Sequence, residues 1–313
     1  MLEVSSSPHI RDAATTRRLM LDVVIALIPA LIAAYILFGT RPLLIVAVAI
    51  SSAILSEYVC RRAMKRYNSI GDMSAVVTGL LLALNLPPSI PLYIVVIGSF
   101  IAIVVIKQMF GGIGNNIINP AMASRVVLTI SFPSAMSRWV LMGEHAFGEQ
   151  VDFISSATPL YILQSGGDMP SYLDLFIGTG KAGSLGEVSI AALSIGILYL
   201  LARKVITLWI PLSYIGTVAA VTAIAGDNPL FHVLSGGLIL GAFFMATDYV
   251  TSPMTRRGKV VFGIGCGLMT AMIRLFGSMT EGVSFSIMLM NMLTPTIEQM
   301  TRPKVFGGGE ARA

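Results

Sequence analysis

Apolar residues in this chain gather into ten runs, separated by short polar segments and by segments that contain glycine or proline. The runs lie at 19–39, 43–60, 74–84, 91–107, 117–133, 186–202, 205–224, 231–247, 260–276 and 282–297. Most approach the roughly 20 apolar residues that a helix needs to cross a bilayer. Lipid offers the backbone no hydrogen-bond partners, so such runs are expected to be helical. The pattern predicts an all-α integral membrane protein with about ten transmembrane helices.

Two interruptions stand out within this pattern. The first is Asn85-Leu86-Pro87-Pro88-Ser89, and the second is Thr247-Asp-Tyr-Val-Thr-Ser-Pro253. Proline removes a backbone donor and disfavours helix in the residue before it. A helix broken at membrane depth needs protein or water around its ends, and those ends can then face an ion or a cofactor. Ordinary loops at the membrane surface would give similar sequences, and that alternative stays open.

The two halves of the chain resemble each other. Ser74-Ala-Val-Val-Thr-Gly79 corresponds to Ser235-Gly-Gly-Leu-Ile-Leu-Gly241, and Ile106-Lys107-Gln-Met-Phe110-Gly111 corresponds to Ile273-Arg274-Leu-Phe-Gly277. Each half has five runs, an odd number, so the halves must be inverted in the membrane. The sequence predicts two inverted five-helix repeats with broken helices. The expected divisions are a first repeat at 1–133, an extracytoplasmic stretch at 134–185, a second repeat at 186–299 and a cytoplasmic tail at 300–313.

Composition and charge support the membrane interpretation. The chain is 55% hydrophobic and 12% charged, whereas soluble proteins carry about 25% charged residues. Sixteen of the 21 basic residues, Lys107 included, fall on one side of the expected layout; four, Arg274 included, fall on the other, and Arg125 lies within a run. Since basic loops stay inside, we expect both termini in the cytoplasm and 134–185 outside. Basic clusters confined to loops argue against nucleic-acid binding.

The outside stretch contains Asp152-Phe-Ile-Ser-Ser-Ala-Thr158-Pro159-Leu160. Pro159 biases Thr158 toward an extended conformation, and the small residues before it would leave the hydroxyl reachable by another enzyme. These features suit a site of covalent modification. Taken alone, they favour an ordinary polar turn over a modification site.

The stretch resembles the flavin-attachment motif Asp-x-x-Ser/Thr-Gly/Ser-Ala-Thr. The whole chain resembles the family that holds the D subunits of Rnf complexes and the B subunits of sodium-pumping NADH:quinone reductases. This resemblance also covers the ten-run plan, the stretch 111–122 (Gly-Gly-Ile-Gly-Asn-Asn-Ile-Ile-Asn-Pro-Ala-Met) and Ile130-Ser-Phe-Pro133. It implies that a flavin transferase esterifies FMN, through its phosphate, to Thr158 and recognises Asp152, Ser155 and Ala157. Ser156 departs from the glycine usual at that position.

The resemblance also implies a function. The chain would be one part of a multi-subunit translocase in a prokaryotic plasma membrane, with its covalent FMN on the extracytoplasmic side and a second, non-covalent riboflavin. Its complex would pass electrons between ferredoxin and NAD⁺ and move Na⁺ or H⁺. The chain lacks nucleotide and iron–sulfur motifs, so partner subunits must supply those centres and we expect no turnover by the chain alone. A stand-alone transporter or channel for a small solute is the alternative.

Several polar residues within or beside the apolar runs are candidates for a cation path or for the second flavin. They are Asn85, Asn115, Asn116, Arg125 and Asp248. A charge at the bilayer centre costs about 2.5–3.5 kcal/mol, so intramembrane charges are functional suspects. Arg125 could pair with a carboxylate or approach a flavin, and Asp248 could bind a cation; either could instead be a helix-end charge that reaches water. The two cysteines form no CxxC, and no metal site is expected.

Overall fold

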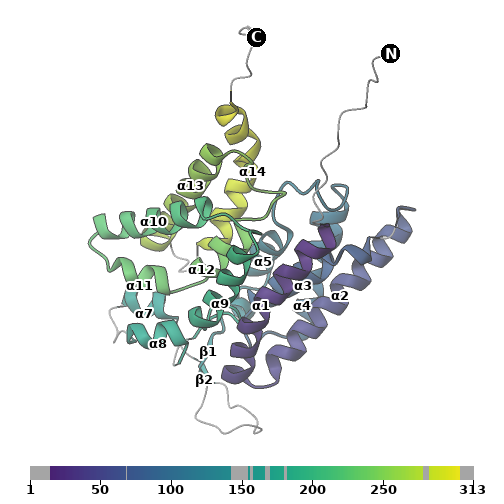
Figure 1. The fold of residues 1–313 in the computed structure, drawn as a ribbon. Helices are drawn as coiled ribbons and strands as arrows, with labels where there is room; N and C mark the ends of the chain where they lie inside the picture. The colour runs from purple at the N-terminus through teal and green to yellow at the C-terminus, as the bar shows by residue number, and fades with distance from the viewer. Residues whose placement is uncertain are drawn as a thin grey trace.

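The computed structural model describes residues 15–67, 69–141, 154–155, 158–165, 170–179, 182–277 and 282–303. Within these ranges the chain is almost wholly helical (Figure 1). Two strands of two residues each, β1 (Val140–Leu141) and β2 (Ile154–Ser155), pair antiparallel in the polar stretch. The all-helical prediction is therefore confirmed for the part of the chain that the structure describes, apart from this short pair.

Helices coincide with all ten predicted apolar runs. The first half contains α1 (Thr16–Phe38), α2 (Arg41–Ala63), the 3₁₀ turn η1 (Ile70–Asp72), α3 (Ser74–Leu84), α4 (Leu92–Phe100) with its π-helical continuation η2 (Ile101–Gln108), α5 (Pro120–Ser131) and α6 (Pro133–Met136). The polar stretch contains α7 (Pro159–Ser165) and α8 (Tyr172–Ile177). The second half contains α9 (Ile190–Ala202), α10 (Trp209–Ile224), α11 (Pro229–Leu234), α12 (Leu238–Leu240), the π-helical η3 (Gly241–Met245), α13 (Arg256–Phe276) and α14 (Val283–Thr301).

Three of the described helices, α1, α2 and α13, are long and apolar enough to cross a membrane. Their outer faces are apolar: on α1, Ile25, Ile28 and Ile32 are 43%, 45% and 53% exposed. This three- and four-residue spacing marks one face of a helix. A continuous exposed apolar stripe is unfavourable in water, and these faces are suited to contact with lipid.

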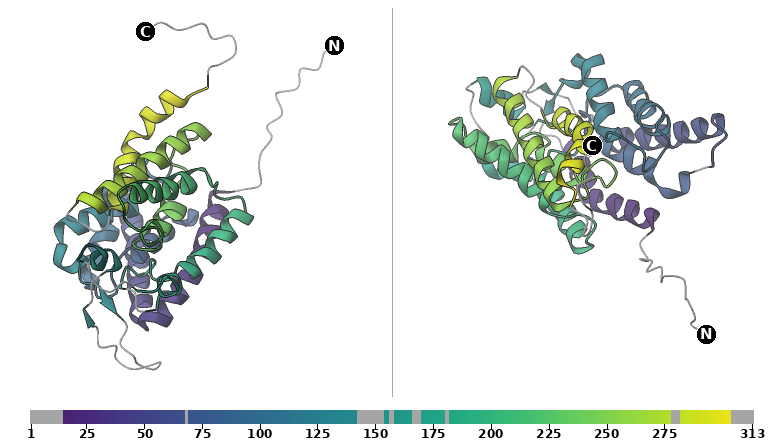
Figure 2. Two further views of the ribbon diagram at one scale, coloured as in Figure 1. Left: turned by 90° about the vertical axis from the view of Figure 1, so that its left-hand side faces the viewer. Right: turned by 90° about the horizontal axis from the view of Figure 1, so that it is seen from above.

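The helices of each half pack mainly with one another. In the first half α2 packs against α3 and α4, and in the second half α10 packs along α13, which also contacts α14. Contacts between the halves come from α1 with α9 and from α5 with α14. In Figure 1 the first-half helices α1 to α4 lie to the right, α10 and α11 lie to the left, and α5 and α9 lie between them; Figure 2 shows the same grouping from two further sides.

Three predicted runs, at 117–133, 186–202 and 205–224, begin as helix three or four residues later than the apolar pattern suggests, and the first two have an identifiable cap. The run at 117–133 becomes helical only at Pro120, because the Asn119 side chain caps the helix by accepting from the amides of Ala121 and Met122. The run at 186–202 starts as helix at Ile190, where Ser189 is the cap.

The prediction of one continuous helix at 231–247 is wrong. The chain divides there into α11, α12 and η3. Gly236 has φ of 60° at the turn between α11 and α12, a left-handed conformation that glycine adopts without steric cost. The second half is therefore interrupted at 235–237 as well as after Met245.

Close backbone approach at Gly196 makes a specific prediction about the contact between the two halves. A Cβ on Gly196, in α9, would collide with the carbonyl oxygen of Ala26 in α1. We expect Gly196→Ala to destabilise the protein by about 1–3 kcal/mol through overpacking. Gly216→Ala, in α10, is the matched control, since no atom lies within 4 Å of its Cβ position. Thermal unfolding in detergent should show a lower midpoint for the first variant and an unchanged or higher one for the second; equal midpoints would contradict this account of the α1–α9 contact.

Candidate functional site

The first helix break is sealed by another part of the chain. The end of α3 leaves the carbonyls of Leu84 and Leu86 outside the helix ladder, and these accept from the amides of Gly186 at 2.7 Å and Leu185 at 3.1 Å. A Cβ on Gly186 would lie 2.9 Å from Cβ of Leu84, so only glycine permits this approach. The buried segment 182–189 thus supplies hydrogen bonds that lipid cannot.

A buried ion pair lies at this break. Nη1 of Arg125, on α5, donates to Oδ1 of Asn85 at 2.9 Å and lies 3.5 Å from Oε1 of Glu187. Arg125 is 4% exposed and Glu187 is 3% exposed. The alternative of a helix-end charge reaching water is therefore wrong for Arg125, and its pairing with a carboxylate is confirmed. Sequence reasoning missed Glu187, because it stands among small residues at the polar start of a run.

The second broken segment meets the same place. A Cβ on Gly237, which precedes α12, would lie 2.7 Å from Oε1 of Glu187. Met245, the last residue of η3, has its sulfur 3.5 Å from Nδ2 of Asn85, and its carbonyl accepts from Nδ2 of Asn119 at 3.4 Å. The two interrupted segments therefore converge around Asn85 and Glu187, although these lie about a hundred residues apart in the sequence.

A cavity of about 100 Å³ lies between the ends of α1, α3, α9 and η3. Its polar lining includes Ser74, Thr78, Lys107, Asn116 and Asp248. A cavity of this size has room for several water molecules.

The five candidates from the sequence thus do not form one cluster. Asn85 and Arg125 meet at the ion pair, whereas Asn116 and Asp248 line the cavity. Asn115 is exposed and belongs to neither group. Among the residues that the structure describes, no group of three or more histidine, cysteine or acidic side chains is placed to hold a metal ion.

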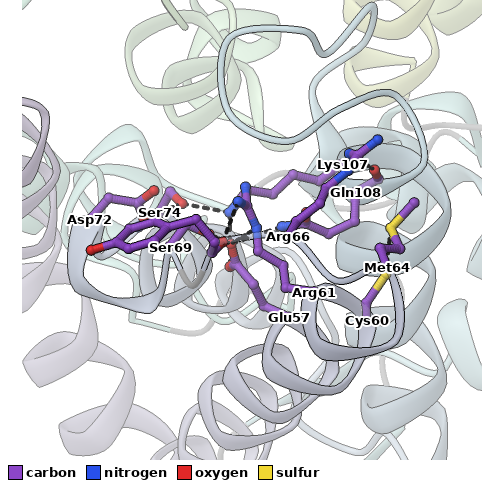
Figure 3. Close-up of polar contacts among 11 residues, drawn as sticks. Glu57, Cys60, Arg61, Met64, Arg66, Ser69, Asp72, Ser74, Lys107 and Gln108 are labelled. Carbon is purple, nitrogen blue, oxygen red and sulfur yellow. Dashed lines mark hydrogen bonds and ion pairs between the residues drawn. The ribbon is translucent and has the colours of Figure 1, made fainter.

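A second buried ion pair borders the cavity (Figure 3). Glu57, on α2, is 0% exposed and accepts from Nζ of Lys107 at 3.0 Å and from Nε2 of Gln108 at 2.8 Å. Ser69 donates to the same carboxylate. Lys107 also donates to the hydroxyl of Ser74, the first residue of α3. The assignment of Lys107 to a cytoplasmic loop is therefore wrong, and Glu57, the one acidic residue in its run, was the available signal.

Arg274 is the residue of the second half that corresponds to Lys107 of the first. It is 2% exposed, so its assignment to an outside loop is also wrong. Its guanidinium donates to the carbonyl of His232 and, at 3.1 Å, to that of Ser235. The similarity between the halves paired Ser74 with Ser235 and Lys107 with Arg274. Lys107 binds the hydroxyl of Ser74, whereas Arg274 binds the backbone carbonyl of Ser235. Both contacts lie beside the start of an interrupted segment.

Thr158 stands at the start of α7, where its carbonyl accepts from the amide of Ile162 at 3.0 Å. It is 5% exposed, so the expectation of a reachable hydroxyl is wrong for this conformation. A methyl carbon of Leu160 lies 2.8 Å from where a Cβ on Gly236 would be, which places α7 against the turn before the second broken segment. Ser155 belongs to β2, while Asp152 and Ala157 lie outside the described residues.

The Glu57–Lys107 pair makes a prediction about stability. Removing one member of a buried pair leaves an uncompensated charge and costs about 3–5 kcal/mol. We expect Lys107→Met and Glu57→Gln each to lower the unfolding midpoint strongly, and the double variant to regain most of the loss. Lys204→Met, at an exposed lysine, should change the midpoint little. Additive losses in the double variant would show that the two side chains are not energetically coupled.

Comparison with known proteins places the chain in a family. The family described as NQR2, RnfD, RnfE matches residues 3–307. The D subunit of a Na(+)-translocating ferredoxin:NAD(+) oxidoreductase complex from Acetobacterium woodii is 47% identical, covering 98% of this chain and 95% of that protein. The D subunit of a proton-translocating ferredoxin:NAD(+) oxidoreductase complex from Clostridium ljungdahlii is 42% identical over 97% and 96% of the two chains. The D subunit of an ion-translocating oxidoreductase complex from Stutzerimonas stutzeri is 39% identical over 93% and 92%. With a match over nearly its whole length, the chain belongs to the NQR2, RnfD, RnfE family.

Proposed function

We propose that this chain is the D subunit of an ion-translocating ferredoxin:NAD⁺ oxidoreductase complex in a prokaryotic plasma membrane. The observation that carries the proposal is the 47% identity, over nearly the full length of both chains, to a protein named as that subunit. Buried charges at interrupted helices often mark ion pathways in membrane proteins. Partner subunits supply the nucleotide and iron–sulfur chemistry.

FMN esterified to Thr158 is the cofactor that fits the sequence motif. The threonine hydroxyl would provide the ester oxygen, and the bound isoalloxazine would supply the redox chemistry. Because Thr158 is 5% exposed in this structure, a transferase reaches it either before α7 packs or after α7 shifts. The contact of Leu160 with the turn at Gly236 then holds the tether beside the second broken segment.

Ten membrane spans in two inverted repeats are the architecture we propose. In its support, α1, α2, α3, α4 with η2, and α5 have counterparts of the same order in α9, α10, α12 with η3, α13 and α14. The contacts of Lys107 with Ser74 and of Arg274 with Ser235, which join matched positions of the two halves, support it further. Removing these two buried residues from the loop counts leaves fifteen basic residues inside and three outside, which still favours cytoplasmic termini and an extracytoplasmic 134–185 stretch.

The polar lining of the cavity suits a cation and its water. Its volume is about 100 Å³, which is enough for several water molecules around an ion. Asp248 and Asn116 offer oxygen atoms of the kind that hard cations bind. The names of the relatives specify Na⁺ in one case and protons in another, so both ions are retained in the proposal.

The covalent flavin is tested by fluorescence of the denatured chain. Thr158→Ala removes the ester oxygen, so we expect the yellow-green band on a denaturing gel under ultraviolet light to disappear. Thr179→Ala, which removes an exposed hydroxyl bonded to Asp174, should keep the band. The complex must be produced in cells that contain the flavin transferase. A dark wild-type band under those conditions would favour the stand-alone transporter.

The proposed orientation is tested by labelling single cysteines, after Cys60 and Cys266 have been replaced by serine. Tyr67→Cys, between α2 and α3, and Tyr172→Cys, at the start of α8, occupy positions 90% and 44% exposed. A membrane-impermeant maleimide added to intact cells should label position 172 and reach position 67 only after the membrane is opened. The opposite labelling order would place the polar stretch in the cytoplasm and contradict the orientation.

A further inference from the structure

The Arg125–Glu187 pair joins three separate parts of the chain. Arg125 comes from α5, Glu187 from the segment before α9, and their shared neighbour Asn85 from the end of α3. Glu187 also packs on Gly237, directly before α12. One buried ion pair therefore touches both interrupted segments, which are the places where the helical wall between the two sides of the membrane is incomplete.

We propose that this pair is the barrier to cation leakage through the protein, and that Arg125 is the residue that excludes cations. The inference rests on the proposed function, because it assumes that cations pass near the broken segments. Glu187 offsets the charge of Arg125 on one side, but a cation that approaches the guanidinium from the other side meets the positive end of the pair, and this repulsion is strong in a low-dielectric interior. While Arg125 is held by Asn85 and Glu187, the route is closed; a cation passes only when the guanidinium leaves these two oxygens.

The proposed movement would involve the arginine side chain and not the backbone around it. Nη1 of Arg125 is shared between a hydrogen bond of 2.9 Å to Asn85 and a longer contact of 3.5 Å to Glu187. The amide nitrogen of Asn85 is meanwhile held by the carbonyl of Leu81 at 2.7 Å, which fixes its oxygen toward α5. The surrounding backbone is thus held in place, whereas the arginine has a long side chain that can turn away.

The test uses the whole complex, purified with its fluorescent flavin and reconstituted in phosphatidylethanolamine/phosphatidylglycerol vesicles. Passive efflux of radioactive Na⁺ and passive proton flux, read with an entrapped pH-sensitive dye, are measured without any electron donor. We expect Arg125→Gln to raise the flux of at least one of these ions tenfold or more. Arg125→Lys keeps the positive charge, so its passive fluxes of Na⁺ and protons should be as low as those of the wild type.

Glu187→Gln is the matched opposite change. It leaves the positive charge of Arg125 in place, so passive flux should remain low. Passive fluxes of Na⁺ and protons through the Arg125→Gln complex that are as low as in the wild type would overturn the proposal. Equal leakage from all three variants would also overturn it, since that result would indicate a packing defect rather than a charge barrier.

Arg125→Gln alone leaves Glu187 buried without its arginine, and such a complex can fail to assemble. The double variant Arg125→Gln/Glu187→Gln removes both charges at nearly constant shape and should leak like the single variant. Low passive flux through the double variant would identify the pair as a structural bridge and overturn the proposal. Failure of both the single Arg125→Gln variant and the double variant to assemble would do the same. A wild-type complex without a fluorescent band or coupled transport would instead reject the proposed function and leave the comparison of passive fluxes readable.

Discussion

Backbone groups that lose their helical partners inside a membrane must find other partners within the protein, because lipid supplies none. This constraint governs the centre of the structure. The carbonyls at the end of α3 are bonded by the amides of Leu185 and Gly186, and the carbonyl at the end of η3 is bonded by Asn119. The segment that seals the first break also carries Glu187 to Arg125. The same segment therefore both bonds the open backbone groups and positions the buried charge of Glu187.

The sequence predicted helices where this constraint demands them. Apolar runs of near-spanning length located the helices, and the paired prolines at 87–88 located the first break. It could not predict where charged residues end up, because position within a run does not reveal what faces it. Lys107 and Arg274 lie at the ends of runs and looked like loop residues, yet both are buried against distant segments. Glu187 was missed for a related reason: a segment rich in glycine and serine looks exposed, although Gly186 is required by its close contact with Leu84.

The attachment threonine and the buried ion pair are connected through the second broken segment. Thr158 begins α7, Leu160 packs against the turn at Gly236, and the next residue, Gly237, lies against Glu187. A redox group tethered at Thr158 would thus be linked, through Leu160 and the turn at 236–237, to the charges that we assign to the cation barrier. Proximity by itself does not establish coupling, which requires an element with two arrangements that both sites bias. The proposed movement of Arg125 away from Asn85 and Glu187 would be such an element.

Mass spectrometry of the peptide 139–181, released by trypsin from the natively matured complex, tests the central claim most directly. This peptide contains the complete attachment motif and ends at Lys181. We expect its mass to exceed that of the bare polypeptide by one esterified FMN, with fragmentation placing the addition at Thr158. A peptide of unmodified mass, from cells that contain the flavin transferase, would contradict the account.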